Sequence, residues 1–302
     1  MSKKSNAIHQ TRLDQAIDII NIFLLCVVLV IFIYPLLFVV SASLSDPGAV
    51  WSGKVWVWPV GFTLDGYQEI IKDTEIWTGY LNSVIYTVVG TLVNLFFTVT
   101  CAYPLSRSDF KARGILMKLY AFTMFFGGGL IPTYLLVQGL GLLDTMWAII
   151  LPSFASVTNI IITRTFFQTN IPTELREAGF LDGCTNLSFL TRIVLPLSKP
   201  ILAVMALYYG VGHWNGFFQA MIYIQDRGKY PLQLFLREIV LQSSMMLEDM
   251  QTGDAELIAK QMQLVEIIKY CAIIVASLPA LIIYPWMQRF FVKGVMIGSL
   301  KG

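Results

Sequence analysis

Six runs of the sequence carry no charged residue, and each is about as long as a helix that crosses a lipid bilayer. A transmembrane helix needs roughly 20 apolar residues, and a charge at the bilayer centre costs at least about 2.5 kcal/mol. The runs are Ile19–Ser45, Ile76–Ser106, Leu119–Leu143, Thr145–Thr163, Pro200–Gln225 and Tyr270–Gln288. They predict an all-α integral membrane protein with six transmembrane helices, in which a tight turn at Asp144 joins the third to the fourth.

The composition is also that of an integral membrane protein. Of its 302 residues, 56% are hydrophobic and only 13% are charged, against a usual charged share of about 25%, and mean hydropathy is +0.67. The net charge of +2 and the lack of a dense basic run argue against nucleic acid as a partner. The first apolar run is too long for the core of a signal peptide, so we expect it to be retained as a membrane helix.

Four cysteines, at positions 26, 101, 184 and 271, lie far apart in the sequence. They form no Cys-x-x-Cys pair and no Cys/His spacing of the kind that binds metal. The sequence therefore predicts neither a disulfide framework nor a metal site.

The distribution of Lys and Arg predicts the orientation in the membrane. With the N-terminus inside, 14 of the 21 basic residues fall in inner segments and 7 in outer segments. The positive-inside rule then places both termini in the cytoplasm of a multi-pass protein.

This orientation divides the chain into predicted regions. They are a cytoplasmic N-terminus (1–18), the first span (19–45), an extracellular loop (46–75), a five-helix core (76–290) and a cytoplasmic tail (291–302). The core includes a cytoplasmic loop at 170–199 and an extracellular loop at 226–265. The second extracellular loop is either a solvated cap or a docking surface for an extracellular partner.

The cytoplasmic loop contains the stretch "IPTELREAGFLDGCTNLSFLTRIVLPLSKP", residues 171–200. Pro172 suits the first turn of a helix, and Glu174 and Glu177 then lie favourably near its positive end. Leu175, Ala178 and Leu181 repeat every three residues and form an apolar face. Gly183 is placed to end this helix, as a C-terminal glycine does.

A second short helix follows the glycine turn. Thr185 or Asn186 can cap its N-terminus, and Phe189 and Ile193 give it an apolar face at a spacing of four. The first helix carries Glu174, Glu177 and Asp182 against Arg176 alone. A helix lying on an anionic lipid surface would be cationic, so a protein partner is the better interpretation.

The same stretch resembles the signature of bacterial ABC importer permeases: Glu-Ala-Ala, three residues, Gly, nine residues, Ile-x-Leu-Pro. Here Glu177-Ala178-Gly179 precedes Gly183 by three residues, and nine more residues lead to Ile193-Val194-Leu195-Pro196. Gly179 replaces the second alanine of the signature. The segments "FTLDGYQEII" and "FFVKGVMIGSLKG" are similar to the maltose-permease-like carbohydrate branch. "FGGGLIPTYLLVQGLGLLDT" and "YPLQLFLREI" are similar to its oligosaccharide and polysaccharide subgroup in Gram-positive bacteria.

This resemblance implies the type I ABC importer permease fold with a cytoplasmic coupling helix. The implied partners are a second homologous permease, two ATPase subunits that bind ATP and Mg²⁺, an extracellular solute-binding lipoprotein and membrane lipid. Glu177 would contact an ATPase, Ala178 and Gly179 would allow close approach, and Gly183 would make the turn. The full set of candidate coupling residues is Glu174, Glu177, Ala178, Gly179, Asp182, Gly183, Ile193, Leu195 and Pro196.

The chain itself shows no G-x-x-x-x-G-K-[ST] phosphate loop, so we expect no enzymatic activity and no cofactor in it. Polar residues inside the spans either pack helices together or line a substrate path. Trp stacks on sugar rings, and Asn and Gln bond hydroxyl groups. The candidate path residues are Asn94, Asn159, His213, Trp214, Asn215 and Gln219.

Two other functions compete with the importer. An ion-coupled secondary carrier would place acidic residues within spans and would show internal repeats, but the six runs contain no Asp or Glu and no repeat is visible. A membrane scaffold without transport activity would not need the coupling signature. Copurification of an ATPase and a second permease would distinguish the importer from both.

Overall fold

The structure is a computed structural model that describes residues 11–248 and 255–299, with side chains described at 11–241 and 263–285. Every regular element in these ranges is helical. The chain divides into two compact units, one formed by Met1–Lys72 with Ile239–Val275 and the other by Asp73–Glu238 with Ala276–Gly302. The prediction of an all-α membrane protein is confirmed.

The first unit begins with one long helix. Helix α1 (Arg12–Ser43) is closed at its N-terminus by a reciprocal capping box between Thr11 and Asp14. Its 32 residues span about 48 Å, more than the hydrocarbon core of a bilayer. Its side chains are exposed along almost all of that length, which is the expected surface of a helix that contacts lipid.

Two short helices, α2 (Pro47–Trp51) and α3 (Asp65–Lys72), pack with the first part of α15 (Ala255–Ser299) at the end of α1. Ser43 joins them, because its hydroxyl accepts a hydrogen bond from Tyr67 at 2.9 Å and its carbonyl accepts one from Cys271 at 3.3 Å. The segment predicted as an extracellular loop is therefore partly helical.

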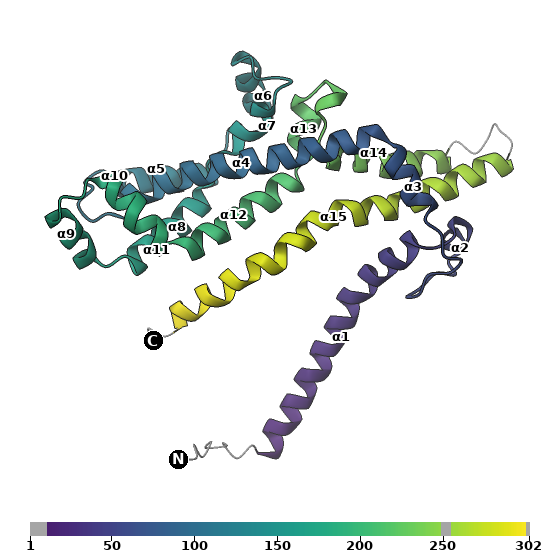
Figure 1. Cartoon of the computed structure of the whole chain (residues 1–302), viewed down its shortest axis with the longest axis horizontal. Helices are drawn as coiled ribbons and strands as arrows, with labels where there is room; N and C mark the ends of the chain where they lie inside the picture. The colour runs from purple at the N-terminus through teal and green to yellow at the C-terminus, as the bar shows by residue number, and fades with distance from the viewer. Residues whose placement is uncertain (1–10, 249–254, 300–302) are drawn as a thin grey trace. The chain divides into compact units, whose positions relative to one another are not determined.

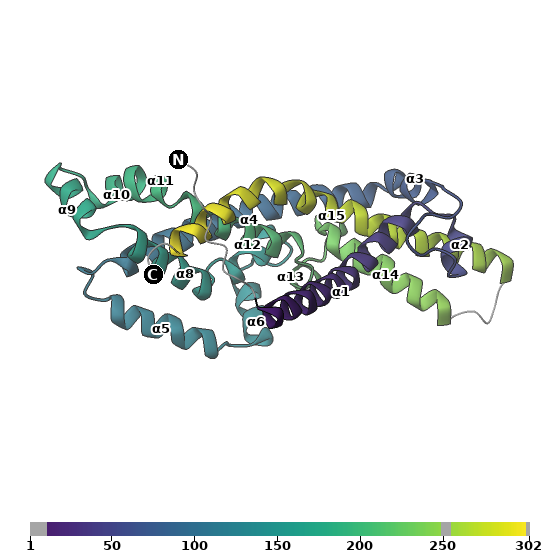
Figure 2. The same ribbon diagram turned by 90° about the horizontal axis from the view of Figure 1, so that it is seen from below.

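The second unit is built around α4 (Thr74–Ser106), which packs against α8 and α12. Figure 1 shows α4 and α12 running alongside each other. The other elements are α5 (Arg113–Phe125), α6 (Leu130–Gly139), α7 (Met146–Ile150), η1 (Leu151–Ser153), α8 (Val157–Asn170), α9 (Thr173–Leu181), α10 (Asn186–Phe189), η2 (Leu190–Val194), α11 (Leu195–Leu197), α12 (Lys199–Trp214), α13 (Phe218–Tyr223), η3 (Arg227–Lys229) and the start of α14 (Leu232–Glu248). Helices α9, α10 and α11 lie together at one end of this unit in both views (Figures 1 and 2).

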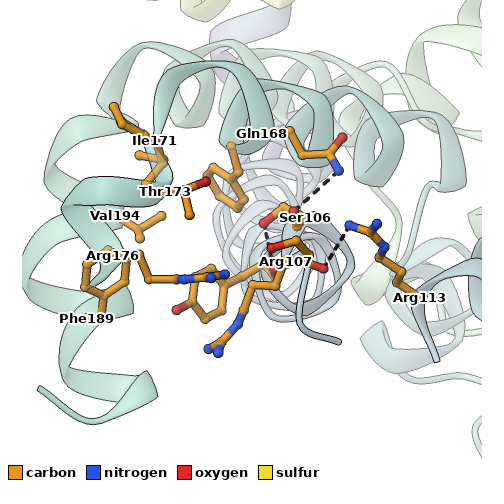
Figure 3. A pocket seen from close by; sticks show the side chains of 13 residues that line it. Ser106, Arg107, Arg113, Gln168, Ile171, Thr173, Arg176, Phe189 and Val194 are labelled. Atoms are coloured by element: carbon orange, nitrogen blue, oxygen red, sulfur yellow. Dashed lines mark hydrogen bonds between the residues drawn. The ribbon is translucent and has the colours of Figure 1, made fainter. Parts of the chain in front are cut away.

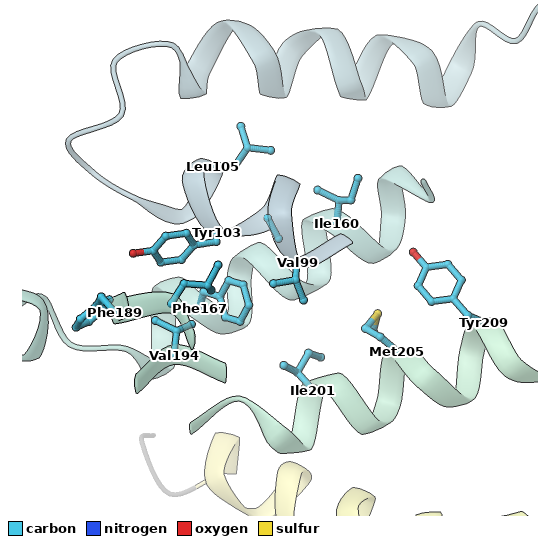
Figure 4. Close-up of a cluster of buried hydrophobic side chains, with 12 residues drawn as sticks. Val99, Tyr103, Leu105, Ile160, Phe167, Phe189, Val194, Ile201, Met205 and Tyr209 are labelled. Carbon is cyan, nitrogen blue, oxygen red and sulfur yellow. The ribbon is translucent and has the colours of Figure 1, made fainter. Parts of the chain in front are cut away.

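The main hydrophobic core of the second unit lies near that same end. Val99 and Tyr103 from α4, Phe167 from α8 and Met205 from α12 are buried together, as Figure 4 shows. Phe189 from α10 joins the same cluster, although it belongs to the predicted cytoplasmic loop. The loop is therefore packed into the helix bundle and does not hang from it as a tether.

The six predicted spans take two forms in the described residues. Three are single helices with the length and composition to cross a membrane: Arg12–Ser43, Thr74–Ser106 and Gln263–Pro285. Three more spans arise only if each bent helix pair counts as one: Arg113–Phe125 with Leu130–Gly139, Met146–Ser153 with Val157–Asn170, and Asn186–Leu197 with Lys199–Trp214. The helix count is thus about six.

The third predicted span is not one straight helix. Its two halves, α5 and α6, meet at 113° across residues 126–129. The break falls on three consecutive glycines, and Gly129 has φ +85°, a left-handed conformation that favours glycine. A run without charges satisfies the hydropathy test whether or not its backbone stays helical, so the sequence pattern missed the bend.

Two other predicted spans need correction. The fourth span bends by 55° near Pro152 and continues as α8 to Asn170, beyond the predicted end at Thr163. The predicted fifth span is divided into α12 and α13. The segment predicted as a tail from 291 is helical to Ser299, and much of the second outer loop is helix α14.

Candidate functional site

The cytoplasmic loop folds into a compact unit that we call the elbow, residues 171–200. Helix α9 forms its first half, and α10, η2 and α11 form the second half. Pro172 is the N-cap residue of α9 and not its first helical residue, one position from the prediction. The helix–turn–helix arrangement expected from the sequence is present.

Gly183 makes the turn between the two halves. It has φ +82°, and its N–H donates to the carbonyl of Phe180 at 3.1 Å, while Cys184 N–H donates to that of Gly179 at 2.9 Å. These two bonds form a Schellman motif, which ends a helix through a left-handed residue. Among the described residues, no atom lies within 4 Å of a Cβ placed at Gly183, so the need for glycine is conformational and not steric.

Gly179 faces the interior of the elbow. It is buried, and a Cβ placed there would lie 2.9 Å from Cδ2 of Phe189. The expectation that Gly179 permits close approach by an ATPase is therefore wrong for this residue. Its small size lets the Phe189 ring pack against α9, with the Phe180 ring stacked 5.9 Å away.

The second half of the elbow begins at Thr185, whose hydroxyl accepts a bond from Ser188 N–H at 3.2 Å. Thr185 is thus the cap, and Asn186 is the first helical residue. The chain then widens into one π-helical turn, η2, before α11. Ile193 and Leu195 are half-buried beside the core, whereas Pro196 is exposed at the approach to α12.

The tip of the elbow exposes acidic and apolar side chains side by side. Glu174, Glu177, Ala178 and Asp182 are exposed. Leu181, between them, is 89% exposed. This mixed face fits a protein groove better than a lipid surface.

Two residues of the α4–α5 loop, absent from the sequence-based set, hold the elbow to the bundle. Arg107 Nε donates to Asp109 at 2.9 Å, and Arg176 on α9 contacts the same carboxylate at 3.2 Å. Arg107 also bonds to the Asn186 side chain and lies 5.5 Å from the Phe180 ring. No local pattern identified these partners, because Asp109 and Arg176 are 67 residues apart in the chain.

The hydrogen bond from Arg107, together with both guanidinium charges, lowers the pKa of Asp109 to about 2. Burial of the carboxyl opposes this shift. Asp109 is therefore ionised at any physiological pH. The ion pair therefore keeps its full charge above about pH 4. It weakens only as the pH falls toward 2 and the Asp109 carboxylate becomes protonated.

Within the bundle, a cavity of about 310 Å³ opens between α4, α8 and α12. Four of the six predicted path residues line it: Asn94, Asn159, His213 and Gln219. Ser153, Ser156 and Tyr208 add hydroxyl groups that the sequence analysis did not single out. The lining offers neutral donors and acceptors and contains no carboxylate, guanidinium or ammonium group.

Asn94 is held in one orientation. Its Nδ2 donates to the Ser153 carbonyl at 3.1 Å, and its Oδ1 lies 3.3 Å from His213 Nε2. This arrangement assigns the proton of the imidazole to Nε2. Gly90 makes room for the ring, because a Cβ there would lie 2.5 Å from Nε2 of His213.

Two predicted path residues lie elsewhere. Trp214 is buried away from the cavity, where its Nε1 donates to the Ala276 carbonyl at 2.9 Å and its ring packs edge-on against Tyr80. Asn215 is exposed at the C-cap of α12 and does not line the cavity. In this structure Trp214 packs helices together, and neither residue is placed to contact a solute in the cavity.

Ion pairs join several loops at the opposite end of the second unit. Arg227 forms two hydrogen bonds with Glu75, at 2.7 and 2.8 Å, and Lys229 contacts Asp144 at 2.9 Å. Asp144 has φ +60° and also accepts two backbone N–H bonds, and the pKa of its carboxyl is lowered to about 2, first by Lys229. The tight turn predicted at Asp144 is thus fastened to the segment before α14.

Comparison with known proteins adds independent information. The chain is 41% identical over 297 residues to protein LplC of Bacillus subtilis, covering 98% of this chain and 99% of LplC. It is 43% identical over 271 residues to YtcP, the polygalacturonan/rhamnogalacturonan transport system permease of the same organism, covering 89% and 93%. A search with models of protein families found no match.

A solved structure has the same fold. It is a bacterial ABC transporter involved in the import of the acidic polysaccharide alginate, and one of its chains matches with a TM-score of 0.84 and 31% identity. The match covers 94% of this chain and all of that one.

Proposed function

Because this chain belongs to the permeases of carbohydrate ABC importers, we propose that it works by converting closure of an ATPase into opening of the cavity between α4, α8 and α12. The permease performs no covalent chemistry. ATP and Mg²⁺ are bound and used by two separate ATPase subunits. A second homologous permease completes the pore, and an extracellular solute-binding lipoprotein delivers the solute.

The observation that carries this proposal is the way the elbow is fixed to the bundle. Phe189 packs into the main core with α4, α8 and α12, and Arg176 is bound through Asp109 to the loop after α4. A force applied to α9 would therefore reach the core helices without being lost in a flexible linker. Glu177, Ala178 and Asp182 at the tip form the contact with an ATPase groove.

The proposed solute is an oligosaccharide or a polysaccharide fragment. A carbohydrate presents many hydroxyl groups, and the cavity supplies matching amide and hydroxyl partners, including Asn159, Tyr208 and Gln219. The transport of polygalacturonan, rhamnogalacturonan and alginate by similar proteins supports the same solute class.

The elbow lies in the cytoplasm in this proposal, with both termini on the same side of a bacterial cell membrane. The excess of Lys and Arg in the inner segments supports this orientation. The ion pairs of Arg227 and Lys229 then face the outside, where the binding protein docks.

Substitution of Gly183 by proline tests the coupling role. Proline cannot adopt φ +82°, and it would also remove the N–H that bonds to Phe180. We expect ATP-dependent uptake of the solute to be abolished, while the amount of permease in the membrane is unchanged. Uptake in vesicles and the quantity of inserted protein are the two measurements.

Gly53 provides a matched control. It has φ +69°, open space around its Cβ position, and an N–H bonded to a carbonyl three residues earlier, but it lies in the first outer loop. Gly53→Pro should leave ATP hydrolysis coupled to uptake. Normal uptake by Gly183→Pro would refute the coupling role, and uptake that never required ATP would favour an ion-coupled carrier.

A further inference from the structure

A second cavity lies at the base of the elbow, where the end of α4 meets the starts of α5 and α9. Its volume is about 220 Å³, and three arginines line it: Arg107, Arg113 and Arg176 (Figure 3). It is separate from the cavity around His213, with which it shares no residue. Its lining carries three positively charged guanidinium groups, whereas the lining of the cavity around His213 is neutral.

The charges around this cavity are not balanced within the described part of the chain. Arg107 and Arg176 share a single carboxylate, that of Asp109. Arg113 donates to the Arg107 carbonyl at 3.2 Å, an uncharged acceptor, as the dashed line in Figure 3 shows. Glu177 lines a neighbouring cavity with two of these arginines but does not line this one. Three guanidinium groups therefore surround the space with one carboxylate in contact.

Neutral donors line the same space. The Tyr103 side chain lines the cavity and is only 8% exposed, and the Arg107 guanidinium lies 5.8 Å from its ring centroid. Its hydroxyl forms no hydrogen bond of ordinary geometry with the described residues. Helix α9 begins at Thr173 in the cavity wall, and its N-cap residue, Pro172, provides no side-chain cap. The first N–H groups of a helix carry a partial positive charge, and anions bind there readily. Glu174, in the same first turn, is exposed and does not line the cavity.

We infer that this cavity binds a phosphate-type anion. Guanidinium groups pair with phosphate oxygens through two parallel hydrogen bonds, and a tyrosine hydroxyl and a helix N-terminus complete the set of donors. The anion would neutralise the excess positive charge of the arginines, and it would connect α9 to the start of α5 and the end of α4. This inference does not depend on the proposed transport function.

Two sources of phosphate fit the position of the cavity. It lies at the end of α4, a helix with the length and composition of a membrane span, and so at the level of a membrane surface. The anion is either the headgroup of an acidic phospholipid or a free phosphate from solution. Both use the same donors, and an experiment with two arms separates them.

The test uses the assembled importer in lipid nanodiscs and follows its thermal unfolding midpoint, which rises when a ligand binds the folded state. One arm titrates inorganic phosphate into nanodiscs of phosphatidylcholine at constant ionic strength. The other arm replaces phosphatidylcholine with phosphatidylglycerol and contains no phosphate. The variants are Arg113→Gln, Arg113→Lys and Lys118→Gln.

Arg113→Gln leaves the ion pairs of Asp109 in place and should weaken anion binding about tenfold or more, because a charge-assisted contact is lost. Arg113→Lys should recover part of that loss. Lys118 is exposed on the same helix, outside the cavity wall, so Lys118→Gln removes an equal charge as a matched control. Phosphate bound by the ATPase subunits shifts every variant alike.

A variant-dependent response to inorganic phosphate identifies a free anion. The same pattern with phosphatidylglycerol alone identifies the lipid headgroup. The inference is overturned if phosphate and phosphatidylglycerol shift the midpoint of Arg113→Gln by as much as they shift that of the wild type, or if they shift neither.

Discussion

At the scale of single residues, glycines serve this fold in two distinct ways. Gly183 is required for its positive φ, since the space around it is open. Gly90 and Gly179 are required for their size, since a side chain would strike His213 in one case and Phe189 in the other. The same amino acid thus makes a turn at the elbow and permits close packing in the bundle.

Gly90→Ala is expected to displace the His213 imidazole and to disturb its contact with Asn94. Overpacking of this kind typically costs about 1–3 kcal/mol, and the cavity would lose part of its shape. We expect reduced uptake together with a lower unfolding midpoint, measured on the purified importer.

Gly114→Ala serves as the control for that substitution. Gly114 lies on α5 with no atom within 4 Å of a Cβ position, so alanine there should be neutral or slightly stabilising. Equal uptake by the two variants would show that the position of the His213 ring does not matter for transport.

At the scale of elements, the elbow depends on a residue outside it. Asp109 joins Arg107 at the end of α4 to Arg176 on α9, so one carboxylate connects a core helix to the proposed coupling helix. The Arg107 and Arg176 side chains are largely buried, at 15% and 19% exposed, and they contact an Asp109 side chain that is 49% exposed, so the carboxylate meets two guanidinium groups and water at once.

Asp109→Asn removes the charge and keeps the size of the side chain. We expect ATP hydrolysis to continue while uptake per ATP falls several-fold, because α9 is less firmly held to α4. Substrate-stimulated ATPase activity and uptake, measured in the same vesicles, give this ratio. Since the pKa of Asp109 is about 2, the wild-type ratio should not depend on this group between pH 5 and pH 8.

Glu69→Gln is the matched control, because Glu69 forms an exposed ion pair with Lys72 on α3. Exposed pairs contribute little, so its uptake per ATP should equal that of the wild type. The double variant that exchanges the charges, Asp109→Arg with Arg176→Asp, should recover part of the uptake per ATP that Asp109→Asn loses. An unchanged ratio in Asp109→Asn would exclude the positioning role.

At the scale of the whole molecule, the orientation in the membrane is the assumption on which the coupling mechanism depends. We expect a cysteine at position 181, introduced as Leu181→Cys, to react with a charged thiol reagent only from the cytoplasmic side. Lys54→Cys in the first outer loop should react only from the outside. The four native cysteines are first replaced by serine, and labelling is compared in intact and opened cells.

The same preparation tests assembly. An ATPase subunit should copurify with the chain, and a crosslinker at position 181 should capture it. Reaction of position 181 from the outside, with no captured ATPase, would exclude the proposed mechanism as a whole.

The sequence by itself determined the features that depend on neighbouring residues. Hydropathy acts over about 20 consecutive residues, so the membrane class and most spans could be predicted. Caps and turns act over four or five residues, so the helix before Gly183 could be predicted, and the cap of the next helix could be narrowed to Thr185 or Asn186, of which the structure selects Thr185. The bend at Gly127–Gly129 was missed, because the hydropathy of an apolar run has the same value whether its helix is straight or broken.

Only the tertiary structure decided which polar side chains meet. Asn94 and His213 are 119 residues apart, and the side of α12 that faces α4 determines that His213 lines a cavity while Trp214 is buried against Ala276. The same holds for Asp109, whose partner Arg176 lies on another helix. Local patterns act on the backbone and on burial, whereas these contacts depend on the relative rotation of packed helices, which no single segment specifies.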